Sequence, residues 1–311
     1  MAGAPLIPRP GAPRRKLTLV ERLDAYERLM RLDKPIGILL LLWPTLCALW
    51  LAARGAPRGS LVLIFVVGTL VMRSAGCALN DWADRDFDGR VARTANRPLA
   101  QRVIAPWEAL AVAAAGALVA FMLVLFTNRA TMLWSIPALA IAIVYPFVKR
   151  FFALPQAFLG IAFSFGIPMA YAAVQDRVPP LAWALLAINL FWVVAYDTEY
   201  AMVDRADDAK IGIRTSALTF GRADVLMVGA CYAIYLIGMV FIGRIYALGA
   251  IYDAALAIAL LIAVHHLWII RSRDAAACFR AFLGNHWLGM AVFAGIAVDY
   301  AYRARQWPHG W

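Results

Sequence analysis

The chain has 311 residues, of which 63% are hydrophobic, and its formal net charge is +11. Soluble globular domains are closer to half apolar, so this composition, with a mean hydropathy of +0.71, excludes an ordinary soluble fold and indicates that lipid is the solvent. In a membrane protein, an excess of Lys and Arg is typical of segments kept on the cytoplasmic face. No nucleic-acid motif accompanies the positive charge, so we expect membrane lipid as the surroundings and no nucleic-acid partner.

The N-terminal segment precedes the first long apolar run. Residues 1–16 are rich in Pro, Arg and Ala, and we expect them to form a disordered leader. Within residues 17–34, four apolar side chains recur at helical spacing among charges: Leu19, Leu23, Tyr26 and Met30. This pattern predicts an amphipathic helix at the membrane interface.

Nine apolar runs follow, each long enough to span or nearly span a bilayer as a helix. They cover approximately residues 36–53, 61–79, 104–126, 132–148, 154–174, 181–197, 223–243, 245–268 and 287–302. We therefore predict an all-α, polytopic membrane protein with nine transmembrane helices. These helices would form a single transmembrane domain over residues 35–302, followed by a short tail at 303–311.

The distribution of Lys and Arg predicts the orientation of the helices. If the N-terminus is cytoplasmic, the segments on that side contain 22 of the 30 basic residues. Such a bias is typical of the cytoplasmic face of a membrane protein. We therefore expect a cytoplasmic N-terminus, and nine spans would place the C-terminus on the opposite side.

Nine of the 19 acidic residues lie in two short stretches, Asn80–Pro98 and Asp197–Asp208, both on the predicted cytoplasmic side. One helical face would carry Asn80, Asp84 and Asp88 if the second span continues as a helix past Asn80. In the second stretch, the helical spacing also gives one face, formed by Asp197, Tyr200, Asp204 and Asp208. We expect the remaining acidic side chains to be solvated or paired with a nearby Arg: Asp86, Glu199 and Asp207.

Two such carboxylate faces favour a divalent cation. Oxygen ligands without His or Cys suit Mg²⁺ or Mn²⁺. Mg²⁺ typically takes one or two carboxylates and fills its other positions with water and phosphate oxygens. The faces therefore predict one or two Mg²⁺ ions with a diphosphate between them. Nearby basic side chains would neutralise the remaining phosphate charge: Arg90, Arg93, Arg97, Lys149, Arg150 and Lys210. The plain alternative is a pair of solvated loops.

Arg73 is an isolated charge inside the second apolar run. It precedes Asn80 by seven residues, which places it close to Asn80 in azimuth and roughly 10 Å deeper along the helix. A charge at such a depth is a candidate functional residue, and a guanidinium can bind a carboxylate bidentately. The alternative is a structural Arg paired with a backbone carbonyl.

A diphosphate site at the mouth of an apolar bundle predicts a prenyl diphosphate substrate. Metal and basic residues would stabilise the departing diphosphate, so that the allylic C–O bond ionises. The resulting allylic cation needs an electron-rich acceptor and the exclusion of water. A carboxylate on that acceptor would explain Arg73.

Three long stretches carry a family resemblance: NDWADRDFDGRVARTANRPLA, YPFVKRFFALPQAFLGIAFSFGIPMAY and YDTEYAMVDRADDAKIGIRTSAL. They resemble the UbiA superfamily of intramembrane aromatic prenyltransferases, and within it the branch that prenylates 4-hydroxybenzoate in bacterial ubiquinone biosynthesis. The likeness runs from about residue 24 to residue 302. It implies nine helices around a central cavity in the bacterial inner membrane, with the active site cytoplasmic and the C-terminus periplasmic. It also implies transfer of a polyprenyl chain to the ring carbon ortho to the hydroxyl of 4-hydroxybenzoate.

The resemblance also implies roles for individual residues. The Mg²⁺ candidates, which would hold the metal with the diphosphate, are Asn80, Asp84, Asp88, Asp204 and Asp208. It also implies that Arg73 faces the aromatic acid and that these residues lie around the diphosphate: Asp81, Arg93, Tyr145, Lys149 and Arg150. Position alone, on or near the two acidic faces, adds three further substrate-binding candidates: Arg97, Tyr200 and Lys210. Either Asp197 or a diphosphate oxygen would take the ring proton.

Two alternatives to this function stay open at the level of the sequence. A sibling prenyltransferase would use another acceptor, such as a naphthoate, homogentisate or haem. A transporter of ions or lipid diphosphates would use the aspartates as a transport site, which predicts carboxylates near the middle of the bilayer.

Overall fold

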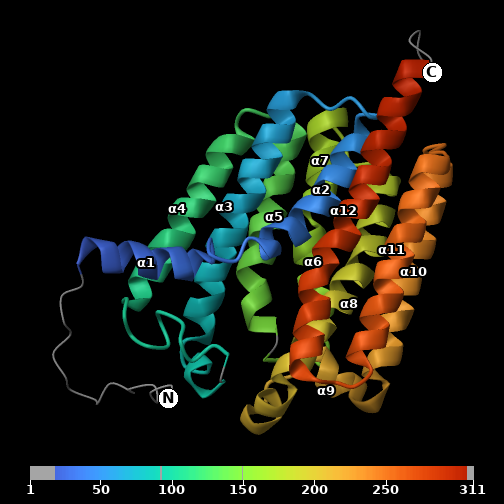
Figure 1. Cartoon of the computed structure of the whole chain (residues 1–311). Helices are drawn as coiled ribbons and strands as arrows, with labels where there is room; N and C mark the ends of the chain where they lie inside the picture. The colour runs from blue at the N-terminus through green and yellow to red at the C-terminus, as the bar shows by residue number, and fades with distance from the viewer. Residues whose placement is uncertain (1–17, 92, 149, 307–311) are drawn as a thin grey trace.

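The computed structural model describes residues 18–91, 93–148 and 150–306. Within them, long helices form a bundle, and one short helix, α1 (Leu19–Met30), runs across it (Figure 1). The expectations for the leader 1–16, for Lys149 and for the last residues of the tail lie outside the described residues. The all-α prediction is confirmed for the part of the chain that is described.

The apolar helices follow the predicted runs. They are α2 (Ile36–Ala52), α3 (Gly59–Asp84), α4 (Pro106–Val124), α5 (Arg129–Val148), α6 (Pro155–Ser164) with α7 (Gly166–Gln175), α8 (Pro180–Ile211), α10 (Asp224–Ile245), α11 (Ala250–Ile270) and α12 (Ala275–Gln306). Eight segments of the described chain are long and apolar enough to cross a membrane, and α2 is a shorter apolar helix of 17 residues. The protein is therefore a multi-pass membrane protein, in agreement with the nine predicted runs.

Several helices extend beyond the apolar runs that predict them. The run 181–197 becomes the 32-residue helix α8, and α12 begins at Ala275 and continues to Gln306, into the predicted tail. Hydropathy marks only the part of a helix in contact with lipid, whereas backbone hydrogen bonds continue into the polar interface. This extension keeps the acidic residues of α8 on a regular helix.

The predicted run 154–174 is divided into α6 and α7 at Phe165. Gly166 begins α7, and a Cβ there would lie 2.4 Å from Oγ1 of Thr45. Pro168 follows within the first turn, where its missing N–H costs no helical hydrogen bond. The interruption therefore lets α7 approach α2 closely.

The amphipathic helix α1 begins at a capping box, in which Thr18 and Glu21 satisfy each other's backbone N–H groups. Its Ala25 and Leu29 are buried, whereas Leu19 and Leu23 of the predicted apolar face are exposed. The buried pair packs in a cluster with Ala78 of α3 and Ala109 of α4. Because only Ala25 and Leu29 of α1 are buried against the bundle, the two leucines stay exposed. A helix at the membrane surface places such apolar side chains in contact with lipid.

The bundle closes by packing α12 against both α2 and α8. The end of α3 that carries Asp84 lies at the same end of the bundle as the short helix α9 (Ser216–Phe220), which follows α8, and the C-terminus of α12 lies at the other end (Figure 1). Both acidic stretches therefore lie at one end of the molecule, as predicted.

Candidate active site

The first acidic stretch begins on the last turn of α3 and continues into a loop. Asp81, Asp84 and Asp88 are only 1%, 3% and 6% exposed. The helix ends at Asp84, and Asp88 opens a short 3₁₀ turn, Asp88–Arg90. The shared helical face expected for this stretch therefore reaches Asp84 but not Asp88.

Tertiary contacts return Asp88 to the same neighbourhood. Nη1 of Arg97 donates to both carboxylate oxygens of Asp88, at 2.9 and 2.8 Å, and lies 3.1 Å from Oδ1 of Asp81. The hydroxyl of Thr94 donates to the carbonyl of Asp88 at 2.7 Å. Arg97 thus joins two carboxylates that the end of the helix separates.

The second acidic stretch lies on α8 without interruption. The helix carries Asp197, Tyr200, Asp204 and Asp208 and ends only at Gly212, which adopts the left-handed conformation with φ of 73°. These four residues therefore share one face of a regular helix, as their spacing predicted. Asp208 is buried, with 8% exposure.

Arg93 links the two stretches. Its Nε donates to both oxygens of Asp204, at 3.0 and 2.9 Å. Its guanidinium lies 4.4 Å from the ring centroid of Tyr200, which stacks on Phe282 of α12 with centroids 4.4 Å apart. Residues that are 111 positions apart in the sequence thus form one site.

Helix α5 contributes Tyr145 to this site. The hydroxyl of Tyr145 donates to Oδ1 of Asn80 at 3.1 Å, and Nδ2 of Asn80 donates to Asp84 at 3.1 Å. The amide of Asn80 therefore connects α5 with the aspartates of α3. Arg150 lies nearby, where it donates to the carbonyl of Ala83 at 2.7 Å.

Two predicted substrate-binding residues have other partners in the structure. Lys210 is 74% exposed and pairs with Asp207 at 3.3 Å, so it lies at the rim. Nη1 of Arg73 donates to the carbonyls of Met30 and Arg31, at 3.2 and 3.4 Å. This is the backbone pairing considered above as the alternative for Arg73, and a cation at the C-terminal end of α1 is favourable.

Sequence reasoning missed Arg31. Its Nη2 lies 2.5 Å from Oδ1 of Asp81, and its side chain is only 20% exposed. Arg31 adopts φ of 53° at the C-cap of α1, which turns its side chain toward α3. No feature of the sequence distinguishes Arg31 from Arg28, whose side chain is 40% exposed and pairs with Asp24 on α1.

Charge alternates across the site. Arg31, Asp81, Arg97 and Asp88 contact one another in that order, so positive and negative groups follow in turn. Burial raises the pKa of Asp88, and the like charges of Asp84 and Asp81 act in the same direction against Arg97. A divalent cation would remove that repulsion.

The donor set fits a hard divalent cation in its chemistry. Carboxylate and amide oxygens meet here, and the buried Oδ2 of Asp81 has no hydrogen-bond partner. Among the described residues, no three Asp, Glu, His or Cys side chains converge as a ready-made metal cage. Mg²⁺ does not need such a cage, because water and phosphate oxygens complete its shell.

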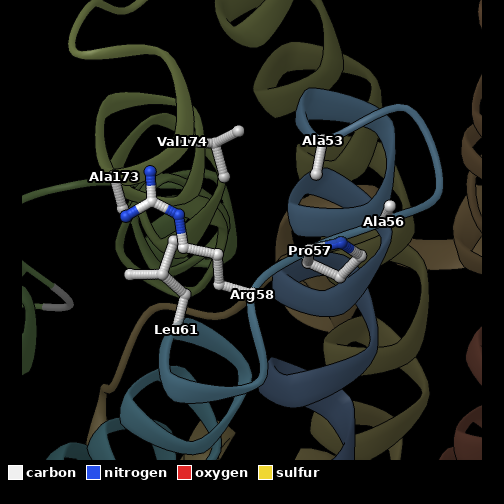
Figure 2. A pocket seen from close by; sticks show the side chains of 7 residues that line it. All are labelled: Ala53, Ala56, Pro57, Arg58, Leu61, Ala173 and Val174. Carbon is white, nitrogen blue, oxygen red and sulfur yellow. The ribbon is translucent and has the colours of Figure 1, made fainter.

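A pocket of about 200 Å³ lies at the opposite end of the bundle. Figure 2 shows its lining, which comes from the α2–α3 connection, the first turn of α3 and α7: Ala53, Ala56, Pro57, Arg58, Leu61, Ala173 and Val174. Arg58 is the one charged residue in this lining. The carboxylates of Asp81 and Asp84 lie at the other end of α3. This pocket is therefore separate from the candidate active site.

Known protein structures share this fold. The apo structure of a UbiA homolog from Aeropyrum pernix K1 superposes with a TM-score of 0.74 at 27% identity, covering 85% of this chain and 97% of that chain. A UbiA homolog from Archaeoglobus fulgidus bound to GPP and Mg²⁺ superposes with a TM-score of 0.66 at 17% identity, covering 88% and 99%. The second likeness bears on the fold alone.

Relatives of known name are much more similar in sequence. The 4-hydroxybenzoate octaprenyltransferase of Azoarcus sp. (strain BH72) is 60% identical over 284 residues, which is 91% of this chain and 99% of the relative. That of Nitrosospira multiformis is 59% identical over 288 residues, covering 93% and 99%. The model of the UbiA prenyltransferase family matches residues 41–290. The chain therefore belongs to the UbiA prenyltransferase family.

Proposed function

We propose that this protein transfers the octaprenyl group of octaprenyl diphosphate to 4-hydroxybenzoate. The observation that carries the proposal is about 60% identity, over some nine tenths of the chain, to relatives named 4-hydroxybenzoate octaprenyltransferase. The octaprenyl length comes from those names. In the reaction the allylic C–O bond breaks, a C–C bond forms at the ring carbon ortho to the hydroxyl, and diphosphate and the ring proton leave. The product has the chemistry of a ubiquinone precursor.

The two acidic stretches form the proposed site for the donor's diphosphate. Asp84, Asp88, Asp204 and Asp208 would hold Mg²⁺, with the amide oxygen of Asn80 as a further ligand. When bound, the metal supplies positive charge that stabilises the leaving diphosphate. The remaining basic and hydroxyl groups would bind phosphate oxygens: Arg93, Arg97, Tyr145, Lys149, Arg150 and Lys210. The burial of Asp84, Asp88 and Asp208 and the Arg93–Asp204 contact support this assignment.

Arg73 is the proposed partner of the acceptor's carboxylate. Its Nη1 is used by the end of α1, while Nη2 and Nε face Gly37, where a Cβ would come within 2.4 and 2.9 Å of them. The absence of a side chain at Gly37 leaves room for the guanidinium beside α2. Nε and one Nη together form the fork that binds a carboxylate bidentately. The phenol oxygen of the acceptor makes the neighbouring ring carbon nucleophilic.

Aromatic side chains surround the place where the allylic cation would form. The ring of Tyr200 already faces the guanidinium of Arg93, and Tyr145 packs against Phe163. Such faces stabilise a cation and exclude water. Asp197 lies on the same face of α8 as Tyr200, and either Asp197 or a diphosphate oxygen takes the ring proton.

The proposed location is the bacterial inner membrane. The bias of Lys and Arg supports a cytoplasmic N-terminus and active site, with the C-terminus in the periplasm. The acidic stretches lie at the ends of helices, which favours an enzyme over a transporter with carboxylates at mid-depth.

An acceptor panel tests the proposal. Membranes that contain the protein would be incubated with labelled octaprenyl diphosphate, Mg²⁺ and, separately, 4-hydroxybenzoate, a naphthoate, homogentisate or haem. We expect prenylated product with 4-hydroxybenzoate. Product with another acceptor alone would contradict the choice of acceptor, and movement of the diphosphate across the membrane without any product would support a transporter instead.

A further inference from the structure

A buried polar cluster lies on the side of α8 away from the aspartates. It contains Glu199 and Trp192 of α8, Tyr232 of α10, His266 of α11 and Asn285 of α12, and we call it the Glu199 cluster. Each member is at most 3% exposed. The expectation that Glu199 is solvated or paired with a nearby Arg is therefore wrong. Its side chain points into the bundle, because it lies about 200° around the helix from Asp197.

The orientation of the Asn285 amide is fixed by its neighbours. Trp192 Nε1, which can only donate, lies 2.9 Å from Oδ1. The carbonyl of Ala281, which can only accept, lies 3.0 Å from Nδ2. Nδ2 therefore also donates to Oε2 of Glu199, at 2.8 Å, and Oδ1 acts as an acceptor.

The contacts of the Tyr232 hydroxyl determine whether the Glu199 carboxyl group carries a proton. The hydroxyl oxygen lies 2.8 Å from Oε1 of Glu199 and 3.0 Å from Oδ1 of Asn285, yet the hydroxyl has one hydrogen. If Glu199 is ionised, both neighbours are acceptors, and one of these contacts has no hydrogen. If Oε1 carries a proton, it donates to Tyr232 and Tyr232 donates to Asn285. His266 Nδ1, at 3.1 Å, then donates to the second lone pair of the Tyr232 oxygen.

Charge leads to the same conclusion. Glu199 is 0% exposed, and no ion pair of the described residues includes it. A carboxylate that is buried without a cation is far costlier than a neutral acid with hydrogen-bond partners. A proton on His266 in place of Glu199 would still leave one of the two Tyr232 contacts, with Glu199 or with Asn285, without a hydrogen.

We infer that Glu199 is a protonated carboxylic acid and a positioning residue, which locks the rotation of α8 against α10, α11 and α12. The lock lies five residues before Asp204, about 7.5 Å along the helix axis. It directs the opposite face of α8, with Asp204 and Asp208, toward Arg93 and the end of α3. Only its effect on turnover rests on the proposed function.

Glu199→Gln separates the neutral acid from the anion. The amide N–H₂ of Gln can donate to Tyr232 as the acid hydroxyl does, and its oxygen can accept from Asn285. We expect turnover with 4-hydroxybenzoate to stay within about threefold of wild type, and Glu199→Leu, which cannot hydrogen-bond, to lower kcat/KM by at least about tenfold. A Gln variant as impaired as the Leu variant would overturn the inference.

Infrared spectra of the purified full-length protein in lipid give a readout that needs no substrate. The difference between wild type and Glu199→Gln should show loss of the carbonyl stretch of a protonated carboxylic acid. Asp299→Asn is the matched control, because Asp299 is 2% exposed but pairs with Arg303 at 2.7 Å and should lose carboxylate bands. Loss of carboxylate bands in Glu199→Gln would overturn the inference. A wrong choice of acceptor would abolish wild-type turnover and leave these spectra unchanged.

Discussion

At the residue scale, arginines occupy the positions between the carboxylates. Arg97 contacts both Asp81 and Asp88, and Arg93 binds Asp204 through two nitrogens. Because Asp88 and Asp204 are largely buried, loss of the arginine that each contacts would leave an unpaired buried charge, which costs about 3–5 kcal/mol. The arginines therefore keep the aspartates close together before any cation binds.

Asp84→Ala tests the metal site. We expect it to lower Mg²⁺-dependent turnover at least about a hundredfold, because it removes charge stabilisation from the leaving diphosphate. Asp86→Ala is the control from the same stretch, since Asp86 is 75% exposed and lies 3.8 Å from Arg85. Steady-state rates at varied Mg²⁺ measure both. Retained activity in Asp84→Ala would count against a metal at this position.

Arg73→Ala tests recognition of the acceptor. We expect a higher KM for 4-hydroxybenzoate with a smaller change in kcat, because the carboxylate does not react. Arg73→Lys should not restore the KM, since an ammonium lacks the bidentate fork.

Arg22→Ala controls for the structural role of Arg73. Arg22 ties the other end of α1 to Glu108 of α4 at 2.9 Å, so its loss loosens α1 and leaves Arg73 in place. An equal rise of KM in Arg22→Ala and Arg73→Ala would show that Arg73 acts only by holding α1.

At the element scale, regular helices could be predicted and the connections between them could not. The spacing of Asp197, Tyr200, Asp204 and Asp208 predicted one face of α8, because local hydrogen bonds alone maintain that geometry. The loop after α3 is held by contacts of Thr94 and Arg97 with Asp88, which helical spacing does not encode. Likewise, the break between α6 and α7 depends on the approach of Gly166 to Thr45, which no local pattern encodes.

Helix α1 delivers Arg31 to the site. Its positive φ at the C-cap could not be predicted, because a left-handed residue there is usually Gly or Asn. We expect Arg31→Ala to reduce kcat/KM by about tenfold or more, since Asp81 loses a buried partner. Arg28→Ala, one turn earlier, should stay near wild type because it removes an exposed pair within α1. Similar rates for both variants would refute a role of Arg31 in the site.

For the whole molecule, hydropathy predicted the apolar helices, and the distribution of charge predicted that both acidic stretches lie at one end. The order in which the helices pack could not be predicted, because one apolar helix face is equivalent to another in lipid. Only tertiary contacts, such as those of α2 with α12, select the arrangement. The Glu199 cluster illustrates this limit: its polar residues are spread over α8, α10, α11 and α12, and no spacing in the sequence relates them.

Binding of metal and diphosphate should stabilise the whole bundle, because the ligands join α3 to α8. A ligand at about 100 times its Kd adds roughly 2.7 kcal/mol. We therefore expect Mg²⁺ with inorganic diphosphate to raise the unfolding temperature of the wild type, and EDTA to reverse the rise. Asp84→Ala should show little of this shift, and an equal shift in that variant would place the ligands elsewhere.

The structure of the reaction product decides whether this protein prenylates the ring of 4-hydroxybenzoate. Purified protein in lipid would be incubated with octaprenyl diphosphate, 4-hydroxybenzoate and Mg²⁺, and the product examined by mass spectrometry and NMR. We expect one octaprenyl group bonded to the ring carbon ortho to the hydroxyl, with the carboxylate intact. A prenyl group on oxygen, or no product with this acceptor while another acceptor is prenylated, would contradict it.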